Sequence, residues 1–236
     1  MFFVVDIDGV LAASSSAIAF YLNRLLDLGI PDEVIEAMPS SAEIAQRPEV
    51  LAYCARGEEF RDRFNAAAQN AQYEAEVQQR KLPIPGSVEG VQALTRYGRV
   101  SYATCRKSRT KDTTVDWLVR YGYPHSEAVY CCDNFLYEKY LVGYEQAGKD
   151  EQIVYIDDLA QPLMAGLRPL VARHRSAAQS LIGRIALLAY GVEEPPTWPT
   201  PRDPYPVLAL PDWSRLSTLL GVAVEKVGGR DLAASA

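Results

Sequence analysis

The sequence is poor in the residues that build zinc centres and disulfide frameworks. It contains only two histidines and four cysteines in 236 residues. The cysteines are Cys54, Cys105, Cys131 and Cys132, and no two of them have the C-x-x-C spacing. This pattern is typical of reduced thiols, so we expect a cytoplasmic protein with neither a zinc centre nor a disulfide scaffold.

An excess of positive charge and a long hydrophobic run are also missing. The formal net charge of −6 argues against nonspecific binding of nucleic acid, whereas a small anionic substrate stays compatible if a metal ion supplies local positive charge. The longest apolar stretch, residues 181–192, contains Arg184 and is too short for a membrane span. Because Asp6 interrupts the first apolar run and no basic region precedes it, we expect no signal peptide. The sequence does not indicate an oligomeric state.

Apolar segments that alternate with helical patterns dominate much of the chain. The pattern predicts strands at residues 2–7, 99–104, 127–132, 152–157, 167–173 and 206–210. Helical patterns lie between several of them, at residues 88–98, 110–122 and 134–148. Such alternation predicts an α/β fold with a Rossmann-like, mostly parallel sheet that carries helices on both faces.

One long segment departs from this alternation. Residues 14–81 are rich in Ala, Glu, Gln, Arg and Leu at helical spacing. We therefore expect residues 1–13 and 82–227 to form the α/β core and residues 14–81 to form a small all-helical unit. Residues 228–236 are expected to form a flexible tail.

Polar residues follow three of the predicted strands, where ligands of open parallel sheets bind. They are Asp6 and Asp8 at the end of the first strand, Thr104 and Arg106 at the end of the second, and Asp157 and Asp158 at the end of the fourth. Lys139 lies in the helix before that fourth strand. Clustered carboxylates with an ammonium and a hydroxyl are typical of a phosphoryl-transfer site that holds Mg²⁺. Asp6 can attack phosphorus, and Asp8 can act as general acid and base.

The segments VVDIDGVL, YATCR and YIDD, with Lys139 between the last two, resemble in this order the four motifs of the haloacid dehalogenase-like (HAD) superfamily of phosphohydrolases. The resemblance implies that Asp6 is the nucleophile and a magnesium ligand, and that Asp8 is the general acid and base and binds the metal through its carbonyl. It also implies that Lys139 stabilises the charged intermediate and that Asp157 binds Mg²⁺. Asp158 would be a metal ligand, or an outer-sphere or orienting partner. Thr104, with Cys105 and Arg106 beside it, would bind the substrate phosphate.

The same resemblance makes residues 14–81 similar to the helical cap that closes over the site in this superfamily. The short interval between Thr104 and Lys139 leaves no room for a second large cap. Two departures stand out. Cys105 occupies a position where many relatives have glycine, and Lys149, in the turn before the fourth strand, is a rival to Lys139.

Several alternatives stay open on the sequence alone. The acidic pairs can be solvated turns or helix caps, and Arg106 can pair with a carboxylate instead of the substrate. A small phosphorylated metabolite or a nucleotide is the expected substrate, and a nucleotidase is the most concrete enzyme. A phosphomutase, or a catalytically silent HAD-fold binding protein, would share the same residues. A receiver domain is disfavoured because its acidic pair, Thr and Lys come in a different order.

Overall fold

The computed structural model describes residues 1–13, 15–38, 41–132, 136–197 and 205–228. A six-stranded sheet forms the centre of the larger part of the molecule, with strand order β5-β4-β1-β6-β7-β8 and parallel pairing throughout. Its strands are β1 (Phe2–Val5), β4 (Arg99–Thr104), β5 (Val129–Cys131), β6 (Ile153–Asp157), β7 (Ile185–Tyr190) and β8 (Val207–Leu210). The predicted α/β fold with a parallel sheet is confirmed, and β1 lies in the interior of the sheet between β4 and β6.

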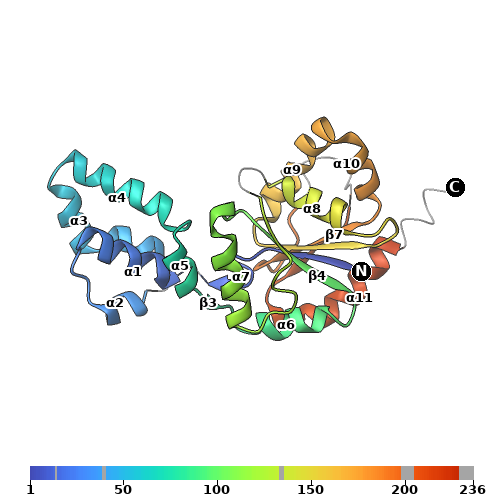
Figure 1. Cartoon of the computed structure of the whole chain (residues 1–236), viewed down its shortest axis with the longest axis horizontal. Coiled ribbons are helices and arrows are strands. Elements are labelled where there is room, and N and C mark those ends of the chain that lie inside the picture. The colour runs from blue at the N-terminus through green and yellow to red at the C-terminus, as the bar shows by residue number, and fades with distance from the viewer. Residues whose placement is uncertain (14, 39–40, 133–135, 198–204, 229–236) are drawn as a thin grey trace.

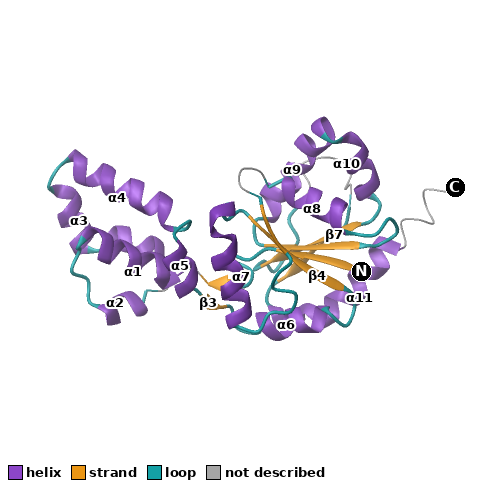
Figure 2. Cartoon of the chain, in the orientation of Figure 1, coloured by secondary structure: helices purple, strands orange, loops and turns teal. Residues whose placement is uncertain are grey.

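Helices cover both faces of this sheet (Figures 1 and 2). One face packs against α6 (Ser87–Leu94), α7 (Lys111–Arg120) and α11 (Leu216–Gly228). The opposite face packs against α8 (Glu138–Gln146), α9 (Ala160–Arg173) and α10 (Arg175–Ile182). Short 3-10 helices, η2 (Ser108–Thr110) and η3 (Trp213–Arg215), precede α7 and α11. Each face therefore has its own apolar layer, as the uninterrupted apolar sequence of β1 requires.

A second group of helices projects to the left of the sheet in Figure 1. It consists of α1 (Ser15–Leu26), α2 (Asp32–Glu36), the 3-10 helix η1 (Ser41–Gln46), α3 (Pro48–Ala55), α4 (Glu58–Ala71) and α5 (Ala75–Arg80). We call residues 15–80 the helical segment. It has a separate apolar cluster that includes Leu22, Ile35, Val50 and Phe64.

Two short strands connect the helical segment to the sheet. β2 (Ala12–Ala13) enters it and β3 (Leu82–Pro83) leaves it, and the two pair antiparallel. The chain therefore enters and leaves the helical segment side by side, next to the end of β1.

One of the predicted strands is wrong. Residues 167–173 belong to α9, which places Leu163, Leu167 and Leu170 on one buried face at helical spacing. The strand that lies there in the sheet is β7, within the apolar run 181–192. Ser14 and residues 229–236, parts of the expected helical unit and of the expected tail, lie outside the described residues. Among the helices described, none is long and apolar enough to cross a membrane.

Candidate active site

The register of the sheet brings three predicted site residues to one edge. Val5 of β1 pairs with Tyr102 of β4 on one side and with Ile156 of β6 on the other. Asp6, Thr104 and Asp157 follow these positions by one or two residues, and all three are buried. The sequence expectation that these strand ends meet therefore agrees with their placement in the structure.

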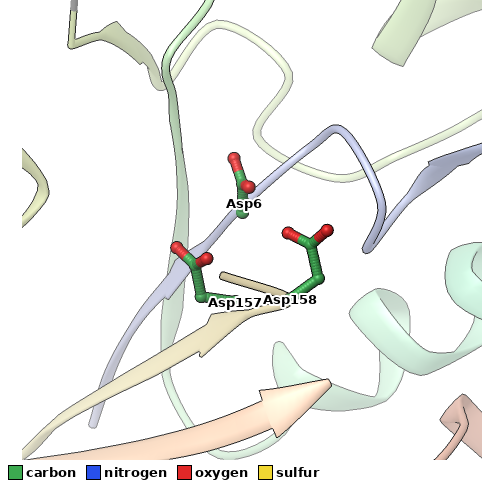
Figure 3. Close-up of side chains that lie close together, drawn as sticks. All are labelled: Asp6, Asp157 and Asp158. Carbon is green, nitrogen blue, oxygen red and sulfur yellow. The ribbon is translucent and has the colours of Figure 1, made fainter. Parts of the chain in front are cut away.

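Three carboxylates form a compact cluster at this edge (Figure 3). One oxygen from each of Asp6, Asp157 and Asp158 lies within 4.8 Å of the others. Burial raises the pKa of Asp6 well above its usual range against the lowering effect of Lys139, and the neighbouring carboxylates raise it further. Burial and Asp157 likewise raise the pKa of Asp158 to about 6. Three hard oxygen donors that repel one another this strongly fit a divalent cation such as Mg²⁺.

Lys139 supplies positive charge inside this cluster. Its Nζ lies 2.7 Å from Asp157 Oδ2 and 3.1 Å from Asp6 Oδ1, and the side chain is only 2% exposed. Burial alone would lower the pKa of Lys139, but Asp157 and Asp6 outweigh it and raise the pKa above its usual value. Lys149, the rival from the sequence, is exposed in the turn before β6. Lys139 is therefore the one of the two that lies in the cluster.

The carboxylate of Asp8 has other partners. Its Oδ1 accepts hydrogen bonds from Lys81 Nζ at 2.6 Å and Arg106 Nη2 at 2.8 Å, and its Oδ2 accepts one from Arg106 Nε at 2.9 Å. Burial would raise the pKa of Asp8, but Arg106 and Lys81 outweigh it and hold the pKa well below its usual range. Arg106 thus pairs with a carboxylate, which was one of its two expected roles. The metal contact expected through the Asp8 carbonyl stays a prediction.

Gly9 allows the loop after Asp8 to pass close to the acidic cluster. It has a φ of +83°, and an added Cβ would lie 2.1 Å from Asp158 Oδ2. Only glycine meets both conditions, the left-handed backbone and the close approach.

The cluster opens into a cavity of about 240 Å³. Its walls combine the predicted site residues other than Asp157 with Gly9, Leu159 and two residues of the helical segment; they are Asp6, Asp8, Gly9, Gln72, Tyr73, Thr104, Cys105, Arg106, Lys139, Asp158 and Leu159. Thr104 Oγ1 accepts the Arg106 N–H at 3.3 Å, which leaves the hydroxyl hydrogen available to another acceptor. Burial raises the pKa of the Cys105 thiol, so Cys105 lines the cavity as an uncharged side chain at neutral pH.

Gly9 and Leu159 line the cavity directly beside predicted residues, and three more distant residues of this site are also absent from the sequence prediction. Lys81 contacts Asp8, and Gln72 and Tyr73 line the cavity from the turn between α4 and α5. No local signal marks them, because a lysine or tyrosine at the end of a helix is usually a surface residue. Asp157 also supports the turn that leads into α9, since its Oδ1 accepts the N–H of Leu159, the residue before that helix, at 2.8 Å.

Among the comparisons with known proteins, only the comparison with solved structures gives matches. No protein-family model and no curated protein matches the sequence. The structure is similar to a HAD family hydrolase from Deinococcus radiodurans, crystallised with phosphate and sodium, at a TM-score of 0.52 and 19% identity over 94% of this chain and 95% of that one. It is also similar to a putative HAD hydrolase from Bacillus subtilis bound to magnesium, at a TM-score of 0.53 and 13% identity over 93% of this chain and 98% of that one. A HAD-like hydrolase from Streptococcus pneumoniae matches at a TM-score of 0.51 and 16% identity over 94% of this chain and 97% of that one. The chain therefore has the fold of the HAD superfamily.

Proposed function

We propose that this protein is a phosphohydrolase that cleaves a small phosphomonoester through an aspartyl-phosphate intermediate. The observation that carries the proposal is the buried Lys139 ammonium held between Asp6 and Asp157, with Asp158 completing the acidic cluster beside a cavity. Burial of so many charged groups has a large desolvation cost. Such clusters are typical of functional sites, and binding of a phosphoryl group and a cation would account for this one.

The proposed reaction has two steps. A carboxylate oxygen of Asp6 attacks phosphorus, the ester P–O bond breaks, and Asp8 donates a proton to the departing oxygen. Asp8 then accepts a proton from water, which attacks the same phosphorus and releases inorganic phosphate and the free Asp6 carboxylate. Lys139 and the Thr104 hydroxyl stabilise negative charge on the phosphoryl oxygens in both steps. The salt bridges of Asp8 in this structure favour its ionised form, which is the form required for the second step. For the first step Asp8 has to bind a proton against the charge of Lys81 and Arg106 before it donates that proton to the departing oxygen.

Magnesium is the cation that fits the proposed site. Asp6, Asp157 and Asp158 would hold it, because their oxygens are hard donors that already lie together. When bound, it would offset the charge of the carboxylates and of the substrate phosphate. The bound magnesium in the Bacillus subtilis structure is a property of that protein, and here the metal rests on the donor set.

The cavity suggests a small substrate that reaches Gln72 and Tyr73 of the helical segment. This position is consistent with a helical cap over the site, as proposed for residues 14–81. A nucleotide or another phosphorylated metabolite stays the proposed substrate class.

The test is a screen of phosphorylated metabolites with Mg²⁺, in which wild type is run beside Asp6→Asn. We expect wild type to release inorganic phosphate from at least one ester and the variant to release none. Full activity in the variant would contradict the mechanism. A wild-type protein that turns over no ester would favour a HAD-fold binding protein, and transfer of phosphate between two positions of a sugar would favour a phosphomutase.

A further inference from the structure

Asp8 is held by two buried cations that come from different parts of the chain. Lys81 is 2% exposed and Arg106 is 1% exposed, and together they donate three hydrogen bonds to the one carboxylate. Arg106 follows Thr104 at the end of β4, whereas Lys81 is the residue between α5 and β3. The carboxylate is thus connected both to the sheet and to the chain that leaves the helical segment.

Lys81 is fixed through its backbone as well as its side chain. Its carbonyl oxygen accepts the indole N–H of Trp117 at 2.8 Å, and Trp117 is fully buried in α7. The neighbouring residues Arg80 and Leu82 are both exposed, so the chain turns only Lys81 inward at this point. A buried ammonium is costly unless it is paired, and the pairing described for Lys81 is with Asp8.

Arg106 has its own support on the same side. Its Nη1 donates to Thr114 Oγ1 at 3.2 Å, and Thr114 lies in α7 one turn before Trp117. Both cations are therefore oriented by α7, so the carboxylate between them has little freedom to rotate.

We propose that Lys81 is a positioning residue that aims the Asp8 carboxylate at the reacting oxygen. Lys81 acts through Asp8 and does not touch the substrate: the cavity is lined by Asp8 and Arg106, and Lys81 is not among its lining residues. The inference rests on the proposed function, because it assigns Asp8 the proton transfers. In addition, the rate of proton transfer by Asp8 would depend on Lys81, the residue at which the chain leaves the helical segment.

The test is a double-mutant cycle of Lys81→Met and Asp8→Asn with 4-nitrophenyl phosphate. This ester has a leaving group that needs little protonation, so the residual turnover of Asp8→Asn is measurable. We expect Lys81→Met to lower kcat by about 10- to 100-fold in the wild-type background, since small displacements of a catalytic group have effects of this size. KM should change much less. In the Asp8→Asn background, Lys81→Met should change kcat by less than about twofold, because the group it positions is already gone.

Two further variants separate positioning from folding. Lys81→Arg keeps the charge and should restore part of kcat, and the exposed neighbour Arg80→Met should leave kcat unchanged. Lys81→Met leaves the ion pair between Asp8 and buried Arg106 in place. If this variant nevertheless folds poorly, Lys81→Gln, which keeps a hydrogen-bond donor without the charge, takes its place in the cycle. A wild-type kcat in Lys81→Met, or an equal loss in both backgrounds, would overturn the inference. Wild type and Asp6→Asn, run in the same assay, report separately on the proposed function: if wild type is inactive, the function fails before Lys81 is judged.

Discussion

Replacement of Lys139 by methionine tests the electrostatic balance of the acidic cluster. The substitution keeps the length of the side chain and removes an ammonium that lies 2.7 Å from Asp157 and 3.1 Å from Asp6. All three side chains are at most 7% exposed, so water cannot replace the lost contacts. Removal of one partner from a buried ion pair typically costs about 3–5 kcal/mol. We expect a loss of this size in the free energy of unfolding at pH 8.

The assay is urea unfolding in the presence of EDTA, with Lys149→Met as the matched control. Lys149 is exposed, and its replacement should change the free energy of unfolding by less than about 0.5 kcal/mol. The loss in Lys139→Met should shrink towards pH 5. The pKa of Asp6 is already raised in the folded protein, so its carboxyl takes up a proton as the pH falls and no longer requires the ammonium.

Excess Mg²⁺ should also reduce the loss, because a cation bound to the carboxylates supplies part of the missing charge. Equal stability of the Lys139 and Lys149 variants at pH 8 in EDTA would refute this reasoning.

Two other predictions concern the loop and the acid beside this cluster. Gly9→Ala should lower the melting temperature and the affinity for Mg²⁺, because the added Cβ would lie 2.1 Å from Asp158 Oδ2. Gly29→Ala is the control, since Gly29 has a similar φ of +72° but a Cβ added there would have no atom within 4 Å. An equal effect of both substitutions would show that the backbone conformation alone is responsible. Asp158→Asn should raise the melting temperature of the metal-free protein at pH 8 and not at pH 4: a carboxyl whose folded pKa is raised to about 6 costs stability as the pH rises above its unfolded value. The same variant should weaken Mg²⁺ binding, measured by calorimetry, by about 10- to 100-fold, and unchanged affinity would exclude Asp158 from the metal site.

The sheet and the acidic residues could be predicted from the sequence because their signals are local. β4 and β6 are short β-branched and aromatic runs, and each ends at the polar residue that the site uses. A single lysine in a helix does not indicate a functional residue. The order of the motifs nevertheless favoured Lys139 over Lys149 as the lysine of the site.

Two parts of the fold could not be read in this way. A run of seven residues such as 167–173 has the same apolar content in a strand and in a helix, and only the buried face shared by Leu163, Leu167 and Leu170 distinguishes them. β7 has the sequence IALLAY, in which four of the six residues are Ala or Leu, so its composition favours a helix, whereas the aromatic and β-branched residues of β1 favour a strand.

The partners of Asp8 depend on tertiary contacts that no sequence spacing encodes. Lys81 is 73 residues away from Asp8 along the chain, and it differs from exposed Arg80 only in the direction in which it points. Asp8 therefore illustrates the limit of the motif: the sequence identifies the carboxylate, and the structure identifies the cations that hold it.

In the proposed mechanism, Asp6 becomes phosphorylated during turnover. The direct measurement is acid quenching of the protein with a phosphate ester that it hydrolyses, followed by borohydride reduction and mass spectrometry of the N-terminal peptide. Reduction converts an aspartyl phosphate to homoserine, so fragmentation distinguishes Asp6 from Asp8. Phosphorylation of Asp6 predicts homoserine at position 6 and unmodified aspartate at position 8. Conversion at position 8, or at neither position while phosphate is being released, would contradict it.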